Sequence, residues 1–124
     1  MELKWKLHAY TFKPGAYITT ETRAIMGVKR GTFVAGVFAR LGEAFNGTTP
    51  TISVGDVAGA VDGFMLTTNI TYATPGLYAG YGSYFSAANG HLYTADDTID
   101  LVYTYNTGTT TGLVTIYIVY CEME

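Results

Sequence analysis

Few residues of this chain have the types and spacing that catalysis requires. Its two histidines, His8 and His91, lie in no recognisable nucleophile or metal motif. Ser83 follows a glycine, but Phe85 stands where the nucleophile elbow needs a second glycine, so that pattern is absent. Cys121 is the single cysteine, and its place in an apolar run predicts a packed side chain rather than a nucleophile.

Carboxylates that could bind calcium lie in the last third of the chain. Calcium takes six to eight oxygen ligands, which Asp96, Asp97 and Asp100 would begin to supply, with Asp56 or Asp62 completing the set. Their spacing matches no calcium-binding loop. We therefore interpret Asp96 and Asp97 as turn residues and Asp100 as a strand residue that faces solvent.

These patterns predict no catalytic residue, no metal site and no cofactor. The Gly80-Tyr81-Gly82 segment lacks the later glycine and the lysine of a phosphate loop. An enzyme would need a site assembled from scattered side chains. The candidates for such a site are His8, Glu43, His91 and Asp100. We expect a protein that is not an enzyme.

An aromatic-rich region offers binding chemistry instead. Aromatic residues and glycines alternate from Gly76 to Phe85. Exposed tyrosine rings stack on sugars or form hot spots against a protein partner, and packing inside the subunit is the alternative. The candidate partner-binding residues are Tyr72, Tyr78, Tyr81, Tyr84, Phe85 and Tyr93.

Composition favours association with other proteins. Charged residues make up 14% of the 124 residues, against about 25% in typical domains, while aromatic residues reach 15%. Tyrosine enrichment with charge depletion is typical of interface cores, so we expect self-association. The net charge is −3, and the sequence lacks the stripe of basic residues that is typical of a protein that binds nucleic acid. No apolar run is long enough for a signal peptide or a membrane span, so we expect folding in a cytoplasm.

The elements that would position these residues are mostly strands within one domain, residues 1–124. Leu3, Trp5, Leu7 and Ala9 alternate with polar residues and predict a strand with that face buried. Capping threonines predict a two-turn helix over residues 19–26. The apolar run over 32–41 predicts a central strand covered on both faces, with its glycines marking a bulge or a close neighbour.

Turn residues predict the remaining connections. Asn46-Gly47 predicts a hairpin into a strand that begins at Thr51, and a further strand is expected over 64–71. Residues 98–105 and 113–121, joined by a polar Thr- and Gly-rich turn, predict a C-terminal hairpin. The expected fold is all-β, an antiparallel β-sandwich or jelly-roll-like barrel with at most one short helix.

Two segments resemble small virion-associated proteins of tailed bacteriophages. The segment from Phe38 to Asp56 ends a strand in an aromatic residue, turns through Asn-Gly-Thr and resumes as a strand that closes in Val-Gly-Asp. The segment from Leu92 to Leu101 is similar to the turn that precedes the C-terminal hairpin in such chains. Together the two segments cover about a quarter of the chain.

The resemblance implies a structural protein of a virus particle. It would be a capsid decoration or stabilisation protein, or another head- or tail-associated subunit, found in the virion and assembled in the host cytoplasm. Its partners would be further copies of itself, the major capsid protein or other virion proteins. The alternative is a carbohydrate-binding β-sandwich, such as a receptor-binding or adhesin module, with residues 78–85 as its stacking platform.

Overall fold

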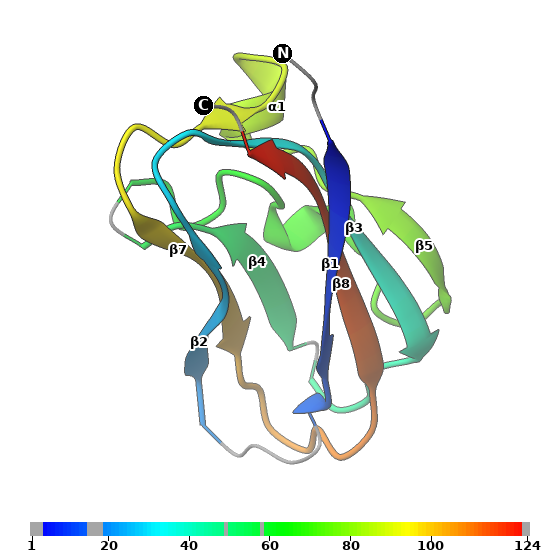
Figure 1. Ribbon diagram of the computed structural model, residues 1–124. Helices are drawn as coiled ribbons and strands as arrows, with labels where there is room; N and C mark the ends of the chain where they lie inside the picture. The colour runs from blue at the N-terminus through cyan, green and yellow to red at the C-terminus, as the bar shows by residue number, and fades with distance from the viewer. Residues whose placement is uncertain (1–3, 15–18, 49, 58, 123–124) are drawn as a thin grey trace.

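The computed structural model describes residues 4–14, 19–48, 50–57 and 59–122, which form two packed antiparallel sheets (Figure 1). In sheet A the strand order is β1-β8-β3-β5, and β6 pairs with another part of β3. Its strands are β1 (Trp5–Phe12), β3 (Thr32–Glu43), β5 (Gly76–Ala79), β6 (His91–Leu92) and β8 (Leu113–Glu122). Sheet B has the order β2-β7-β4, with β2 (Glu21–Val28), β4 (Thr51–Gly55) and β7 (Asp97–Thr104).

The core lies between the two sheets. Alternate residues of β8 face it, and Ile116 and Ile118 are fully buried there. From sheet B, Leu101 and Tyr103 of β7 meet them, and the Tyr103 ring lies 5.1 Å from that of Phe12. Two such apolar inner faces are what a sandwich requires. The predicted all-β sandwich is confirmed.

Two helical segments lie wholly within the described residues, and each is a single turn. The 3-10 helix η2 (Thr67–Asn69) lies beside β4, and α1 (Ser83–Ser86) lies at the end of the sandwich where the N-terminus is drawn (Figure 1). Neither these nor any other helix within the described ranges has the length and apolar character to cross a membrane.

Strand β3 has the central position that its apolar run predicts, but the predicted cover on both faces is wrong, because within the described residues only its inner face is covered. It pairs with β8 along one edge and with β5 and β6 along the other. Its register with β8 shifts between Val34 and Gly36 and again between Leu41 and Glu43. The prediction that Gly36 and Gly42 mark irregularities is therefore confirmed.

The predicted helix over residues 19–26 is wrong. From Glu21 onward this segment is strand β2, which pairs with β7 along its whole length, with a bulge at Ile25. A two-turn helix is marginal because nucleation is costly, whereas pairing with β7 satisfies the backbone and buries Ile25. The expected strand over 64–71 is also wrong, because Met65 makes one bridge to Val54 and η2 follows.

Both predicted hairpins are wrong, since their strands lie in opposite sheets. β3 belongs to sheet A and β4 to sheet B, and β7 and β8 are divided in the same way. The two connections instead pack against each other. Asn46 Oδ1 accepts the N–H of Thr110 at 2.7 Å and that of Thr111 at 2.9 Å. Turn residues mark where a chain reverses, but they do not determine which sheet the next strand joins.

The predicted orientation of the N-terminal strand is inverted. Leu3 lies outside the described residues, but Trp5 and Leu7 are 55% and 63% exposed and Ala9 is exposed too. The opposite face of β1 packs inward, with Phe12 buried. Alternation therefore identified the strand, but not the face that is buried.

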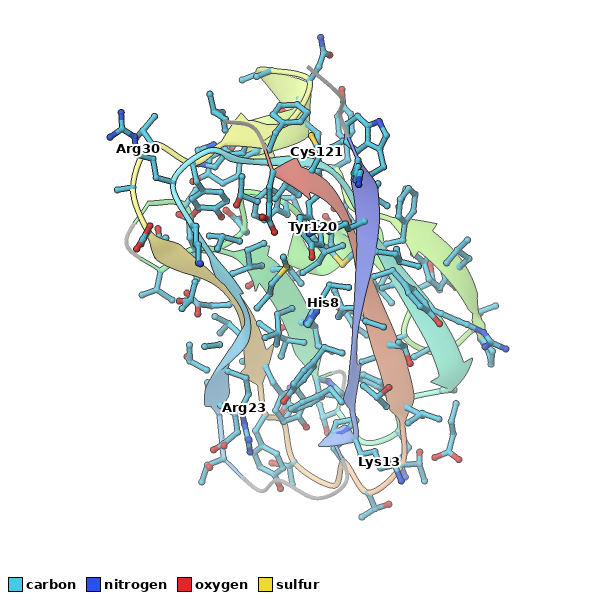
Figure 2. All side chains as sticks on the ribbon, in the orientation of Figure 1. His8, Lys13, Arg23, Arg30, Tyr120 and Cys121 are labelled. Atoms are coloured by element: carbon cyan, nitrogen blue, oxygen red, sulfur yellow. The ribbon has the colours of Figure 1, made fainter. Side chains whose placement is uncertain are left out.

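His8 lies on that inward face and joins the two sheets. Its Nε2–H donates to the Ile25 carbonyl at the bulge of β2, at 2.8 Å (Figure 2). The bulge takes this carbonyl out of the regular pairing with β7, and the imidazole supplies a donor for it.

Candidate functional site

The strand register of sheet A defines a mostly apolar face that points away from sheet B. Residues paired directly across strands share one face, so the pairings give four rows. These rows are Trp5–Cys121–Phe33–Leu92, Leu7–Val119–Gly36, Ala9–Tyr117–Phe38–Ala79 and Thr11–Thr115–Arg40–Leu77. We call this set the outer face of sheet A. Arg40 is its only charged residue.

Several large side chains of this face are open to solvent. Leu7 is 63% exposed, Leu77 68% and Leu92 47%. Single exposed apolar residues are ordinary, but a contiguous apolar patch on a sheet marks an interaction surface. Sheet A is thus apolar on both faces, and sheet B covers only the inner one.

The sequence of β8 is apolar on the outer face as well as on the inner face, which alone would predict a strand covered on both sides. Residues 113–121 are almost continuously apolar, which is typical of a strand covered on both faces. Within the described chain, nothing forms a third layer over Tyr117 and Val119. The outer side chains of β8 are therefore not covered by the described part of the chain.

Cys121 lies at one end of the outer face and is 1% exposed. It is paired directly with Trp5 on one side and Phe33 on the other. The prediction of a packed side chain is confirmed.

The six aromatic residues predicted to bind a partner lie in different environments. Tyr72 and Tyr93 are buried, at 9% and 3% exposure. Tyr72 lies inside the sandwich, where its hydroxyl donates to the Ile52 and Thr67 carbonyls and accepts the Ile52 N–H. Neither ring is presented to a partner by this chain.

The other four aromatic residues lie nearer the surface. Tyr78, Tyr84 and Phe85 are partly buried against the core, and the Phe85 ring lies 5.7 Å from that of Phe64. The Tyr78 hydroxyl donates to backbone carbonyls of the 71–74 segment. Only Tyr81, 60% exposed, has most of its surface free among these six. Its role as a contact residue stays a prediction.

A buried carboxylate organises the end of the molecule near α1. Asp56, 2% exposed, follows β4 and accepts the Tyr84 hydroxyl at 2.9 and 3.0 Å to its two oxygens. It also accepts the Tyr93 hydroxyl at 2.9 Å and the Ala60 N–H at 2.9 Å. One side chain thus joins α1, the segment before β7 and its own loop.

The tyrosines around Asp56 hold their protons strongly. Burial together with the hydrogen-bonded Asp56 carboxylate raises the pKa of Tyr84 to about 12. Burial and the same carboxylate also raise the pKa of Tyr93 well above its usual value. Both phenols therefore remain hydrogen-bond donors to Asp56 throughout the physiological pH range.

Glycines allow this cluster to close. A Cβ at Gly59 would lie 2.4 Å from Asp56 Oδ1, and one at Gly63 would lie 2.3 Å from the Tyr84 ring. At Gly82 a Cβ would lie 2.1 Å from the Asp62 carbonyl oxygen. The glycines of this region therefore provide space for close packing of backbone and aromatic rings.

The acidic residues considered for calcium have separate structural partners. Asp96 Oδ1 accepts the Arg30 N–H at 3.0 Å and Asp97 Oδ1 accepts the Thr98 N–H at 2.7 Å. The expectation that Asp100 faces solvent is wrong. Asp100 is 7% exposed and accepts from the Thr98 hydroxyl and the Val57 N–H. Across the described ranges, no three His, Cys, Asp or Glu side chains gather to hold a metal ion.

The scattered residues that an enzyme would need are not brought into one network. His8 binds the β2 backbone, and Glu43 Oε1 accepts the Gly112 N–H at 2.9 Å at the far end of β3. His91 stacks on Tyr84 with ring centroids 3.8 Å apart, and Asp100 binds Thr98. Each of these side chains has a structural contact of its own.

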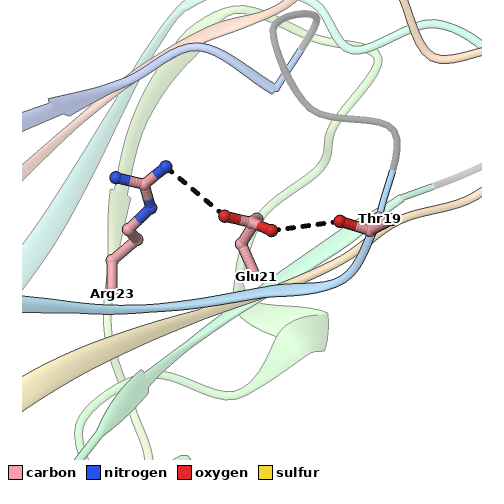
Figure 3. A network of polar contacts seen from close by, with 3 residues as sticks. All are labelled: Thr19, Glu21 and Arg23. Atoms are coloured by element: carbon pink, nitrogen blue, oxygen red, sulfur yellow. Dashed lines mark hydrogen bonds and ion pairs between the residues drawn. The ribbon is translucent and has the colours of Figure 1, made fainter.

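A polar network at the start of β2 is of the ordinary surface kind. Arg23 Nη2 donates to Glu21 Oε1 at 3.4 Å, and the Thr19 hydroxyl donates to Glu21 Oε2 at 3.1 Å (Figure 3). Partly exposed ion pairs of this geometry contribute about 1 kcal/mol or less to the free energy of unfolding. The network links Thr19, Glu21 and Arg23 at the beginning of β2.

Known proteins resemble this chain in fold and not in sequence. No family model and no curated protein sequence matches it. A chain from the acidic stable capsid structure of Helicobacter pylori bacteriophage KHP30 superposes with a TM-score of 0.68 at 14% identity, over 94% of this chain and 86% of the other. The expected likeness to proteins of phage particles is confirmed at the level of the fold.

Two further capsid structures contain a similar chain. One is the capsid asymmetric unit of cyanophage Pam1, with a TM-score of 0.63 and 15% identity over 97% of this chain and 84% of that one. The other is the capsid of Ralstonia phage GP4, with a TM-score of 0.63 and 15% identity over 99% and 86%. The shared region is nearly the whole of each chain.

Proposed function

We propose that this protein is a non-enzymatic structural subunit of a virus particle, of the capsid decoration or stabilisation type. The observation that carries the proposal is the likeness of almost the entire chain to chains of three phage capsids. Because the likeness spans both sheets, it concerns the whole sandwich rather than a common local motif.

The outer face of sheet A supports a mode of action. Its rows contain one charged residue, and four of its large apolar side chains, Trp5, Leu7, Leu77 and Leu92, are exposed. Burying such a face against a neighbouring subunit removes apolar surface from water without first desolvating charges. The partner is a second copy of the chain, the major capsid protein or another virion protein. Because one particle offers many equivalent positions, modest affinity at each contact would give strong overall binding.

The carbohydrate-binding alternative is less well supported. A stacking platform needs several exposed ring faces, whereas Tyr78 and Tyr84 are partly buried and have hydroxyls bonded within the chain. Among the aromatic residues of the 78–85 segment, only Tyr81 keeps most of its surface exposed. One ring can contribute to a glycan site, but it does not make a platform.

Quantitative mass spectrometry of purified particles tests the proposal. Particles produced by the genome that encodes this chain should contain it in a fixed, repeated ratio to the major capsid protein, and the ratio should survive a salt wash. Its absence from particles, or a trace level that varies between preparations, would overturn the proposal.

A further inference from the structure

A cavity opens beside the buried carboxylate Asp56, at the end of the molecule away from the Asn46 connection. Its volume is about 260 Å³. It is lined by Asp56, Gly59, Tyr84, residues 91–95 and Asp97. The outer face of sheet A does not include this region, apart from Leu92, so the contacts proposed above leave the cavity unexplained.

The charge of the cavity is uncompensated. Asp56 and Asp97 both line it, and no lysine or arginine is among its lining residues. The two ion pairs found within the described ranges, Lys6–Glu122 and Arg23–Glu21, involve neither aspartate. A carboxylate as buried as Asp56 is ordinarily paired with a cation. Here its donors are neutral groups, the Tyr84 and Tyr93 hydroxyls and the Ala60 N–H.

Aromatic rings form part of the cavity wall. Tyr84 and His91 are stacked with ring centroids 3.8 Å apart and an interplanar angle of 20°. Tyr93 stands at 86° to His91, with centroids 4.6 Å apart. Tyr84 and His91 therefore each cover one face of the other, and a planar guanidinium can lie against the rest of this aromatic wall while donating to a carboxylate.

The site is held in this shape before any ligand arrives. Hydrogen bonds from Tyr84 and Tyr93 fix the Asp56 carboxylate, and Gly59 and Gly63 allow the loop and the Tyr84 ring to close around it. Binding would therefore order few groups and would incur little conformational cost.

We propose that this cavity binds a guanidinium group, supplied in an assembly by an arginine side chain of a neighbouring protein chain. The identity of the donor rests on the proposed function, but the guanidinium chemistry does not. Arginine is preferred to lysine because its planar group can donate two parallel hydrogen bonds to the Asp97 carboxylate, which lines the cavity.

Titration of the free protein with a blocked arginine, N-acetyl-arginine methylamide, tests the site directly. In two-dimensional amide NMR spectra at pH 8, the amides of Gly59, Tyr84 and residues 91–97 should shift and saturate at millimolar concentrations. N-acetyl-citrulline methylamide, which has nearly the same shape and no charge, should cause much smaller shifts. Equal shifts from citrulline, or shifts that never saturate, would overturn the proposal.

A matched pair of variants assigns the effect to the cavity. Asp97→Asn should weaken the binding of the blocked arginine about fivefold, the effect of losing one partly exposed ion pair. Asp62→Asn removes the same charge from a residue outside the cavity lining and should leave binding unchanged. Equal weakening by both variants would show only a general charge effect and would also overturn the site. These results do not depend on whether particles contain the protein, so the two proposals can fail separately.

Discussion

Asp56 is the residue on which most polar contacts of the α1 end converge. From the sequence alone, Asp56 is a possible calcium ligand and the last residue of a strand that closes in Val-Gly-Asp. Its partners Tyr84 and Tyr93 lie 28 and 37 residues away along the chain. No spacing rule connects these positions, so the cluster could not be predicted without the fold.

Replacing Asp56 with alanine should destabilise the protein. The change leaves the Tyr84 and Tyr93 hydroxyls and the Ala60 N–H without their acceptor. We expect the free energy of unfolding to fall by about 2–4 kcal/mol in urea denaturation. Asp62→Ala, which removes a carboxylate from the same loop, should cost less than about 1 kcal/mol. Equal midpoints for the Asp56 variant and the wild type would contradict the role assigned to the carboxylate.

The raised tyrosine pKa values predict a loss of stability in alkali. The pKa of Tyr84 is about 12 in the folded chain, against about 10 when unfolded. The unfolded state therefore releases this proton first, so this stability is complete below pH 10 and is lost as the pH rises toward 12. Denaturation between pH 9 and 11.5 should show the decline, and Tyr84→Phe should reduce its slope. An unchanged slope in that variant would contradict the assignment.

At the scale of elements, apolar pattern predicted strands better than it predicted their partners. The run over 32–41 and the alternation over 98–105 correspond to β3 and β7, because a strand buried in a sandwich needs those patterns. The segment 19–26 has helix-capping residues and still forms β2, since pairing with β7 prevails over a weak local preference. Which sheet each strand joins is a tertiary property.

The orientation of β1 was inverted for a related reason. Its apolar residues Trp5 and Leu7 mark the outer face, because sheet A is apolar on both sides. An alternating pattern identifies a buried face only when the other face is in contact with water in the working state of the protein. The missed residues are thus those that form the candidate interface.

A pair of glycine variants tests the packing between α1 and the 62–63 segment. At Gly82, where φ is −79°, an added Cβ would lie 2.1 Å from the Asp62 carbonyl oxygen. Gly82→Ala should lower the free energy of unfolding by about 2 kcal/mol or more, through overpacking alone. At Gly27 in β2 nothing lies within 4 Å of such a Cβ, so Gly27→Ala should be neutral or slightly stabilising. Similar unfolding curves for the two variants would contradict the packing described.

For the molecule as a whole, the proposed association with other proteins depends on how apolar surface is distributed over the two sheets. One sheet contributes a face to the core and presents a second, almost uncharged face outward. The low charge content of the chain pointed to association from the beginning. Composition does not locate the contact surface. The aromatic residues predicted to form that surface include Tyr72 and Tyr93, which are buried.

The most direct test is binding of the purified chain to particles assembled without it. Wild-type protein should bind saturably, and Leu7→Glu should bind at least about tenfold more weakly, because it places a charge on the outer face of sheet A. Thr22→Glu, an equal change on an exposed position of sheet B, should bind as the wild type does. Wild-type binding by Leu7→Glu, or loss of binding only in Thr22→Glu, would contradict the assignment of this face as the interface.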